Sequence, residues 1–187
     1  MFIASYPVDS VGFVQAVTEI GFKPKIIGGG MVGLQSTSVK TQLGTKLNGF
    51  IDYDFWLPVE TMKFPGVLDM LTRYQAKAEA EGVDPLGYYM APFAYAYIDL
   101  LGQAVTATKG TDDAKIAEYL HSAEHKTFIG PVKFNAGGEW EKDRQLLIQF
   151  QGVKGNGLDQ FKGTAVQPIL SPASAATGKY MEFNKAR

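Results

Sequence analysis

The segment from Ser5 to Gly33 constrains the fold more than any other part of the chain. It follows a short apolar run, Phe2-Ile3-Ala4, that predicts the end of a β-strand. Asp9 or Ser10 can then cap a helix through its side-chain oxygen. The expected helix carries an apolar stripe at helical spacing, formed by Phe13, Val14, Val17 and Ile20.

A second strand and a glycine-rich turn follow this helix. Gly21 ends the helix and Pro24 prevents its return. Lys25-Ile26-Ile27 predicts a short strand, and the residues from Gly28 to Gly33 predict a turn. The order of strand, helix and strand is a βαβ unit, so we expect an α/β fold. Because the first strand has almost no lead-in, we expect this chain to be a piece of a larger α/β binding protein.

The rest of the chain alternates between predicted helices and strands. Pro58 and Pro65 mark the best internal break between two units. The segment 88–108 is mostly apolar and predicts a long, largely buried helix. The other expected elements are strands within 48–56, 128–134 and 146–150, a short helix or loop at 36–46, and helices at 65–82 and, capped by Thr111 or Asp112, at 111–120.

Composition excludes several classes of protein. The apolar fraction of 45% is that of a globular protein rather than a disordered chain. The net charge of −1 gives no reason to expect nucleic acid as a partner. The chain has no cysteine, which removes disulfides and thiol chemistry. No apolar run approaches the ~20 residues that span a bilayer.

The run from Gly28 to Gly33 formally matches the GxGxxG pattern of dinucleotide-binding proteins. Such a site needs the turn to open a helix whose amides hold the pyrophosphate. The residues from Leu34 to Lys40 form a poor amphipathic helix start, so a backbone turn at a cleft is the better interpretation. A nucleotide-binding α/β enzyme remains the alternative from a different class.

The polar residues form no convincing catalytic or metal-binding set. His121 and His125 are the only histidines, and their spacing could place both on one helical face. Solvated surface histidines explain them better. Asp52, Asp54 and Glu60 resemble paired carboxylates but are equally well explained as solvent-facing acids beside a cleft. We therefore expect no cofactor, no metal and no enzymatic activity.

Aromatic residues are more informative, because they fall at the ends of predicted elements or beside turns. Each one alone is explained by packing, but together they suit an apolar ligand cleft with tyrosine hydroxyls as polar groups. Ligands of open α/β sheets lie beyond the carboxyl ends of the strands. The residues concerned are Tyr6, Tyr53, Phe55, Trp56, Tyr88 and Tyr89.

Five segments in the same order resemble the type I periplasmic binding proteins of ABC transporters, in particular the branched-chain amino acid and amide group. The similarity runs from about Ser5 to the C-terminus. The segments are Ser5-Tyr-Pro-Val-Asp-Ser10, Gly28-Gly-Gly-Met-Val-Gly33, Asp54-Phe-Trp-Leu-Pro58, Tyr88-Tyr-Met-Ala-Pro-Phe-Ala-Tyr95 and Gly130-Pro-Val-Lys-Phe-Asn-Ala-Gly-Gly-Glu-Trp140.

This resemblance implies a clamshell of two α/β lobes that close on a small-molecule ligand. Residues 1–56 would be part of the second lobe, 57–143 the C-terminal part of the first lobe, and 144–187 the return to the second. The first half of the fold would be missing, and a self-dimer could stand in its place. The implied partner is an ABC transporter permease, and the implied location is the periplasm, with a signal peptide upstream. A cytosolic ligand-sensing regulator of the same fold is the alternative.

Two positions carry over from the family individually. Tyr6 matches a cleft tyrosine that packs on the ligand, and Gly30 aligns with an acidic residue that faces the ammonium of amino-acid ligands. Because glycine has no charge, an unpaired ammonium would cost several kcal/mol here. We therefore expect an aromatic or other apolar carboxylate rather than a free α-amino acid. The expected cleft wall consists of Tyr6, Gly30, Met31, Tyr53, Phe55 and Tyr89.

Overall fold

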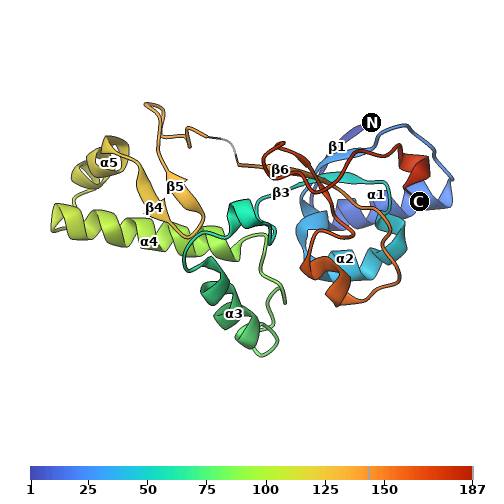
Figure 1. Ribbon diagram of the computed structural model, residues 1–187, viewed down its shortest axis with the longest axis horizontal. Coiled ribbons are helices and arrows are strands. Elements are labelled where there is room, and N and C mark those ends of the chain that lie inside the picture. The colour runs from blue at the N-terminus through green and yellow to red at the C-terminus, as the bar shows by residue number, and fades with distance from the viewer. Residues whose placement is uncertain (143, 187) are drawn as a thin grey trace.

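The computed structural model describes residues 1–142 and 144–186, which form two parts joined by connecting segments (Figure 1). One part is built on a five-stranded sheet and contains both chain ends; we call it the sheet part. The other consists of three helices and a two-stranded hairpin; we call it the helical part. The α/β fold class expected from the sequence is therefore correct.

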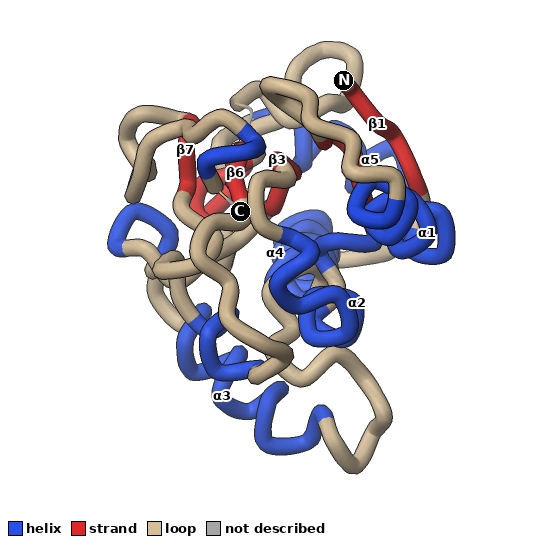
Figure 2. Tube along the Cα trace, turned by 90° about the vertical axis from the view of Figure 1, so that its right-hand side faces the viewer, coloured by secondary structure: helices blue, strands red, loops and turns tan. Residues whose placement is uncertain are grey.

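The sheet has the order β1-β2-β3-β6-β7, so β1 and β7 are its two edges (Figure 2). The first three strands are parallel, whereas β6 runs antiparallel to both β3 and β7. The polypeptide therefore leaves the sheet after β3, builds the helical part, and returns to pair with β3. The strands are β1 (Phe2–Ser5), β2 (Gly28–Met31), β3 (Ile51–Asp54), β6 (Leu146–Gln149) and β7 (Ile169–Ser171).

The second strand lies where the sequence predicted a turn, so both the strand at Lys25–Ile27 and the turn at Gly28–Gly33 were wrong. Gly28 has φ +124°, and a Cβ there would lie 1.8 Å from the carbonyl oxygen of Ile51. Gly28 therefore lets β2 approach β3 more closely than any side chain permits. A strand without side chains carries no hydrophobic periodicity, which is why the sequence pattern missed it.

Two helices pack against the sheet, α1 (Pro7–Glu19) and α2 (Thr37–Leu43). The predicted cap at Asp9 or Ser10 was wrong, because Pro7 already occupies the first helical turn and Tyr6 is the cap residue. The Ser10 hydroxyl instead shares a 2.8 Å hydrogen bond with that of Ser5.

The helical part contains α3 (Val67–Ala78), α4 (Ala91–Thr108), α5 (Asp113–Ser122) and the hairpin β4 (His125–Thr127) with β5 (Gly130–Val132). Asp112 caps α5 by accepting from the Lys115 amide, as predicted. The expectation that 88–108 is largely buried was wrong. Pro92, Ala96, Leu100 and Ala104 face the interior, whereas Tyr97 and Ile98 are exposed.

Short 3₁₀ helices complete the described structure, at Val32–Gln35, Gly44–Leu47, Glu60–Met62, Leu158–Lys162 and Phe183–Lys185. The sheet part has an aromatic core in which Phe50 packs edge-on against Phe183 near the C-terminus. None of the described helices is both long and apolar enough to cross a bilayer.

Candidate ligand-binding cleft

The carboxyl ends of the parallel strands face the junction between the sheet part and the helical part. Tyr6 directly follows β1, Met31 ends β2, and Phe55 directly follows β3. Loops at this end of an α/β sheet are the usual place for a ligand. The chain order alone therefore brings three predicted cleft residues to one edge.

Aromatic rings from both parts meet at this junction. Phe55 lies 5.4 Å from Tyr53, 6.0 Å from Tyr89 and 5.3 Å from Phe93, measured between ring centroids. The Phe55 and Tyr89 rings are stacked, with an interplanar angle of 26°. We call Tyr53, Phe55, Tyr89 and Phe93 the aromatic wall. Such rings offer large apolar faces with edges and hydroxyls that orient a ligand.

Three tyrosines place their hydroxyls within electrostatic reach of one another. Burial raises the pKa of Tyr89, and Tyr53, Asp54 and Tyr6 raise it further. Burial likewise raises the pKa of Tyr53, with Tyr6 among the smaller contributions. The hydroxyls of Tyr53 and Tyr89 therefore keep their protons at neutral pH and can donate hydrogen bonds. Tyr6 itself is 74% exposed, so its ring is free for a ligand.

A cavity of about 670 Å³ opens on the sheet and shares Tyr53 with the aromatic wall. Gly30 and Tyr53 line it together with Phe2 and Leu147. A Cβ at Gly30 would lie 3.7 Å from the carbonyl oxygen of Ile3, an ordinary contact, so this position has room for a side chain. The glycine is therefore not required by packing.

Met31 differs from the other predicted wall residues. Its side chain is 0% exposed and belongs to the core, so the expected soft contact with a ligand is not available in this structure. Its amide donates to Asp52 Oδ1 at 2.9 Å. Met31 thus links the cleft edge of β2 to a buried carboxyl group on β3.

Buried charges lie beneath the cleft rather than on its wall. Lys40 Nζ lies 3.5 Å from Asp54 Oδ2 and donates to Gln167 Oε1 at 3.0 Å. Burial raises the pKa of Asp52 to about 8, with Asp54 adding to the rise and Lys40 opposing it. Asp52 is therefore mostly protonated at neutral pH, and Lys40 balances Asp54. Because both carboxyl groups are buried, the expectation of solvent-facing acids at these two positions was wrong.

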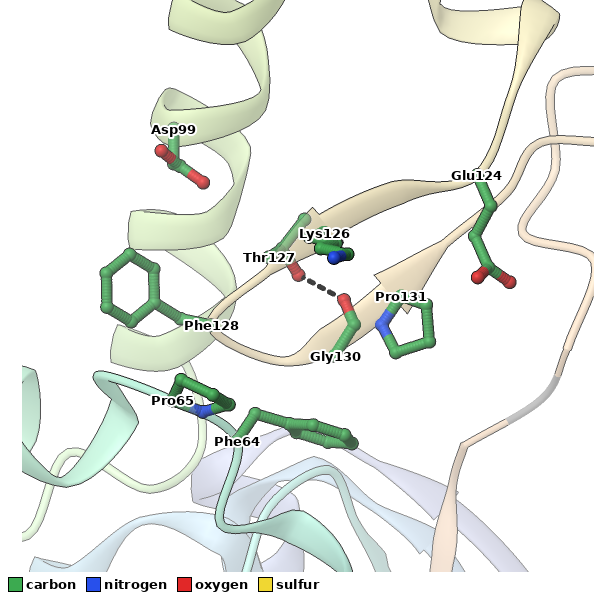
Figure 3. Close-up of a pocket in the computed structure, with 9 residues that line it drawn as sticks. All are labelled: Phe64, Pro65, Asp99, Glu124, Lys126, Thr127, Phe128, Gly130 and Pro131. Atoms are coloured by element: carbon green, nitrogen blue, oxygen red, sulfur yellow. Dashed lines mark hydrogen bonds between the residues drawn. The ribbon is translucent and has the colours of Figure 1, made fainter.

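A second cavity, of about 530 Å³, lies under the β4–β5 hairpin and contains none of the predicted residues (Figure 3). Phe64, Pro65, Phe128 and Pro131 give it an apolar lining. Of its acidic groups, Asp99 accepts a hydrogen bond from Gln103. The first cavity is the better candidate for a ligand site, because Gly30 and Tyr53 of the predicted cleft wall line it.

The two histidines do not share a helix. Helix α5 ends at Ser122, and His125 begins β4, where it is buried against the Tyr119 ring. Its Nε2 lies 3.0 Å from the Leu120 carbonyl oxygen. The prediction of a solvated histidine was therefore wrong at position 125. Within the described residues, no group of three or more His, Asp or Glu side chains is arranged to hold a metal ion.

Sequence reasoning missed several residues of this region. Phe93 lies four residues after Tyr89, in the first turn of α4, and its ring lies 6.3 Å from that of Trp140. The i, i+4 spacing of Tyr89 and Phe93 was a usable signal. The contact between Lys40 and Gln167 gave no signal in the sequence, because 127 positions separate the two residues.

Comparison with known proteins places this architecture in a family. A family model described as "Periplasmic binding protein" matches residues 1–147. A curated relative, the Leu/Ile/Val-binding protein homolog 8 of Brucella abortus, is 28% identical over 158 residues. That match covers 80% of this chain and 38% of the relative.

Solved structures share the fold at low sequence identity. A leucine-binding protein from Thermotoga maritima matches with a TM-score of 0.62 at 17% identity, covering 81% of this chain and 41% of that one. A branched-chain amino acid transporter substrate-binding protein from Streptococcus pneumoniae, solved with isoleucine, matches with a TM-score of 0.63 at 15% identity, covering 91% and 44%.

The chain therefore spans less than half the length of these relatives. The family match nevertheless extends over most of the chain and includes every strand of the parallel set, the aromatic wall and the hairpin. The GxGxxG run forms a strand rather than a phosphate-binding turn, which removes the argument for a nucleotide site. The chain belongs to the periplasmic binding protein family.

Proposed function

We propose that this chain is part of the substrate-binding component of an ABC importer in the periplasm, where it captures a small organic ligand and presents it to the permease. The family match over residues 1–147 carries this proposal. The aromatic wall supports it, because rings from both parts of the molecule converge at the strand ends.

In this proposal the two parts belong to different lobes of a clamshell. Residues 1–56 and 144–187 belong to the second lobe, and 57–143 to the first. Exposed apolar groups fit this arrangement: β1 is an edge strand, and Tyr97 and Ile98 project from α4. These surfaces would contact the remainder of each lobe, which the longer relatives possess.

We further propose that the ligand is an aromatic or other apolar carboxylate. The aromatic wall supplies apolar faces, and the protonated hydroxyls of Tyr53 and Tyr89 supply donors for a carboxylate. None of the wall residues is acidic, and Asp52 and Asp54 are buried beneath it. An ammonium group placed against this wall would therefore lack a charged partner.

Calorimetric titration with a panel of ligands tests the proposal. The panel contains phenylacetate and benzoate, the matched amino acid phenylalanine, and leucine. We expect the aromatic acids without an ammonium group to bind more tightly than phenylalanine. A strong preference for leucine would reject the ligand class but keep the binding function, whereas failure of a broad panel of amino acids and organic acids would count against both.

Replacing Tyr6 with alanine should weaken ligand binding without destabilising the fold. The side chain is 74% exposed, so we expect the free energy of unfolding to change by at most about 0.5 kcal/mol. Loss of an aromatic contact of about 1.4 kcal/mol would lower the affinity about tenfold. Tyr97→Ala is the matched control, because Tyr97 is 70% exposed on α4 and does not belong to the aromatic wall. Equal losses in the two variants would contradict the assignment.

Introducing an acid at Gly30 should shift the preference toward α-amino acids. Gly30 lies outside the left-handed region and has room for a Cβ, so Gly30→Asp should fold. A new ion-paired hydrogen bond to the ligand ammonium should raise affinity for phenylalanine about tenfold or more. Gly29→Asp is the contrasting variant, because a Cβ there would lie 2.3 Å from the Phe2 ring and Gly29 has φ +132°. Unchanged selectivity in a folded Gly30→Asp protein would remove Gly30 from the cleft wall.

A further inference from the structure

Arg144 lies where the chain returns from the helical part to the sheet, two residues before β6. Its guanidinium reaches back to the hairpin of the helical part. Nη2 donates to the Pro131 carbonyl oxygen at 2.6 Å, and Nη1 donates to the Ile129 carbonyl oxygen. The two acceptors flank Gly130, so the planar guanidinium spans the start of β5.

The same guanidinium contacts two aromatic rings. Its Cζ lies 5.3 Å from the centroid of Phe64 and 5.0 Å from that of Trp140. Phe64 belongs to the connection that leaves the sheet after β3, whereas Trp140 lies at the end of the extended hairpin. Arg144 belongs to the connection that returns to the sheet. Its side chain therefore touches both the outgoing connection and the hairpin.

Gly130 is the position that allows this close approach. It has φ +94°, and a Cβ there would lie 2.3 Å from Arg144 Nη1 and 2.5 Å from Phe64 Cζ. Phe64 also lines the 530 Å³ cavity, together with Pro65, Phe128 and Pro131 (Figure 3).

We propose that Arg144 is a positioning residue that holds both connections against the hairpin and thereby sets the orientation of the helical part relative to the sheet part. Its guanidinium is engaged by the Ile129 and Pro131 carbonyl oxygens and by two rings, so it acts through the connections rather than by contact with a ligand. The consequence for binding rests on the proposed function, since the aromatic wall is assembled from both parts. The proposed effect of Arg144 on the orientation of the two parts does not rest on that function.

Spin labels on the two parts test the orientation directly, without any ligand. The chain has no cysteine, so Gln42→Cys on α2 and Glu118→Cys on α5 provide two unique, exposed attachment sites. In the otherwise unchanged protein we expect a narrow distance distribution by pulsed electron paramagnetic resonance. Arg144→Ala should broaden it, and Arg144→Lys should restore it only in part, because lysine lacks the planar fork. Arg73→Ala is the control, because Arg73 forms only an exposed pair with Asp69 on α3.

Two further variants keep the test decisive if Arg144→Ala folds poorly. Phe64→Leu removes the stacked ring but leaves both hydrogen bonds, and Gly130→Ala displaces the guanidinium without altering it. Broadening in these variants would support the positioning role. A distribution as narrow as that of the parent in folded Arg144→Ala, or in folded Gly130→Ala, would overturn it. Neither outcome depends on whether a carboxylate ligand binds.

Discussion

Replacing Lys40 with methionine should lower the free energy of unfolding by about 3–5 kcal/mol, because it leaves a buried carboxylate without its cation. The side chains of Lys40 and Asp54 are only 3% and 1% exposed. Lys40 also donates to Gln167, whose own amide is held by the Phe161 carbonyl oxygen at 2.9 Å. The network therefore joins α2, the end of β3 and the C-terminal segment. Urea denaturation at pH 7 measures the loss.

The double variant Lys40→Met/Asp54→Asn separates the unpaired charge from the lost packing. It should recover most of the stability, since the amide carries no charge to desolvate. Arg73→Met, which breaks the 3.2 Å exposed pair with Asp69, should cost less than about 1 kcal/mol. If Lys40→Met costs no more than Arg73→Met, the buried pair does not stabilise this fold.

The protein should lose stability as the pH rises from about 5 to 8, and Asp52→Asn should remove much of that loss. Burial raises the pKa of Asp52 from 3.8 to about 8 in the folded state. Between these values the folded state binds a proton that the unfolded state releases. The contribution of Asp52 to the free energy of unfolding is therefore greatest below pH 4. It falls by about 1.4 kcal/mol per pH unit between the two pKa values and levels off above pH 8.

Denaturation curves of the parent and Asp52→Asn at intervals across this range isolate the contribution by subtraction. Asparagine retains an oxygen for the Met31 amide, so the fold should persist. Asp69→Asn makes the same change from carboxyl to amide at an exposed position on α3 and serves as the control. Parallel curves for the parent and Asp52→Asn would show that Asp52 titrates normally despite its burial.

The sequence predicted much of the helical part and the class of fold, because α1, α3, α4 and α5 each carry an apolar stripe or a recognisable cap. It failed where side chains are absent or where the partner is remote. The glycines of β2 have no periodicity to read, and the exposed face of α4 looks as apolar as its buried face. The helix alone cannot show which face meets a partner.

The candidate cleft was predicted in the same uneven way. Tyr6, Tyr53, Phe55 and Tyr89 converge because strand ends of a parallel sheet share one edge. Met31 adjoins them in sequence but turns into the core, where Asp52 accepts its amide hydrogen. Arg144 gave no local signal, because its role depends on carbonyl groups in the hairpin and on a ring in the other connection. Contacts of that kind are fixed only by the tertiary structure.

The antiparallel pairing of β3 with β6 has a topological consequence. Asp54, the last residue of β3, lies opposite Leu146, the first residue of β6, so the two strands pair side by side like the arms of a β-hairpin. The whole helical part is then an insertion at the tip of that hairpin, and the strands of the five-stranded sheet pair without it. A tight Asn-Gly turn between these strands would have the geometry to replace the insertion. The architecture is thus a small α/β sheet with the helical part inserted in the loop between β3 and β6.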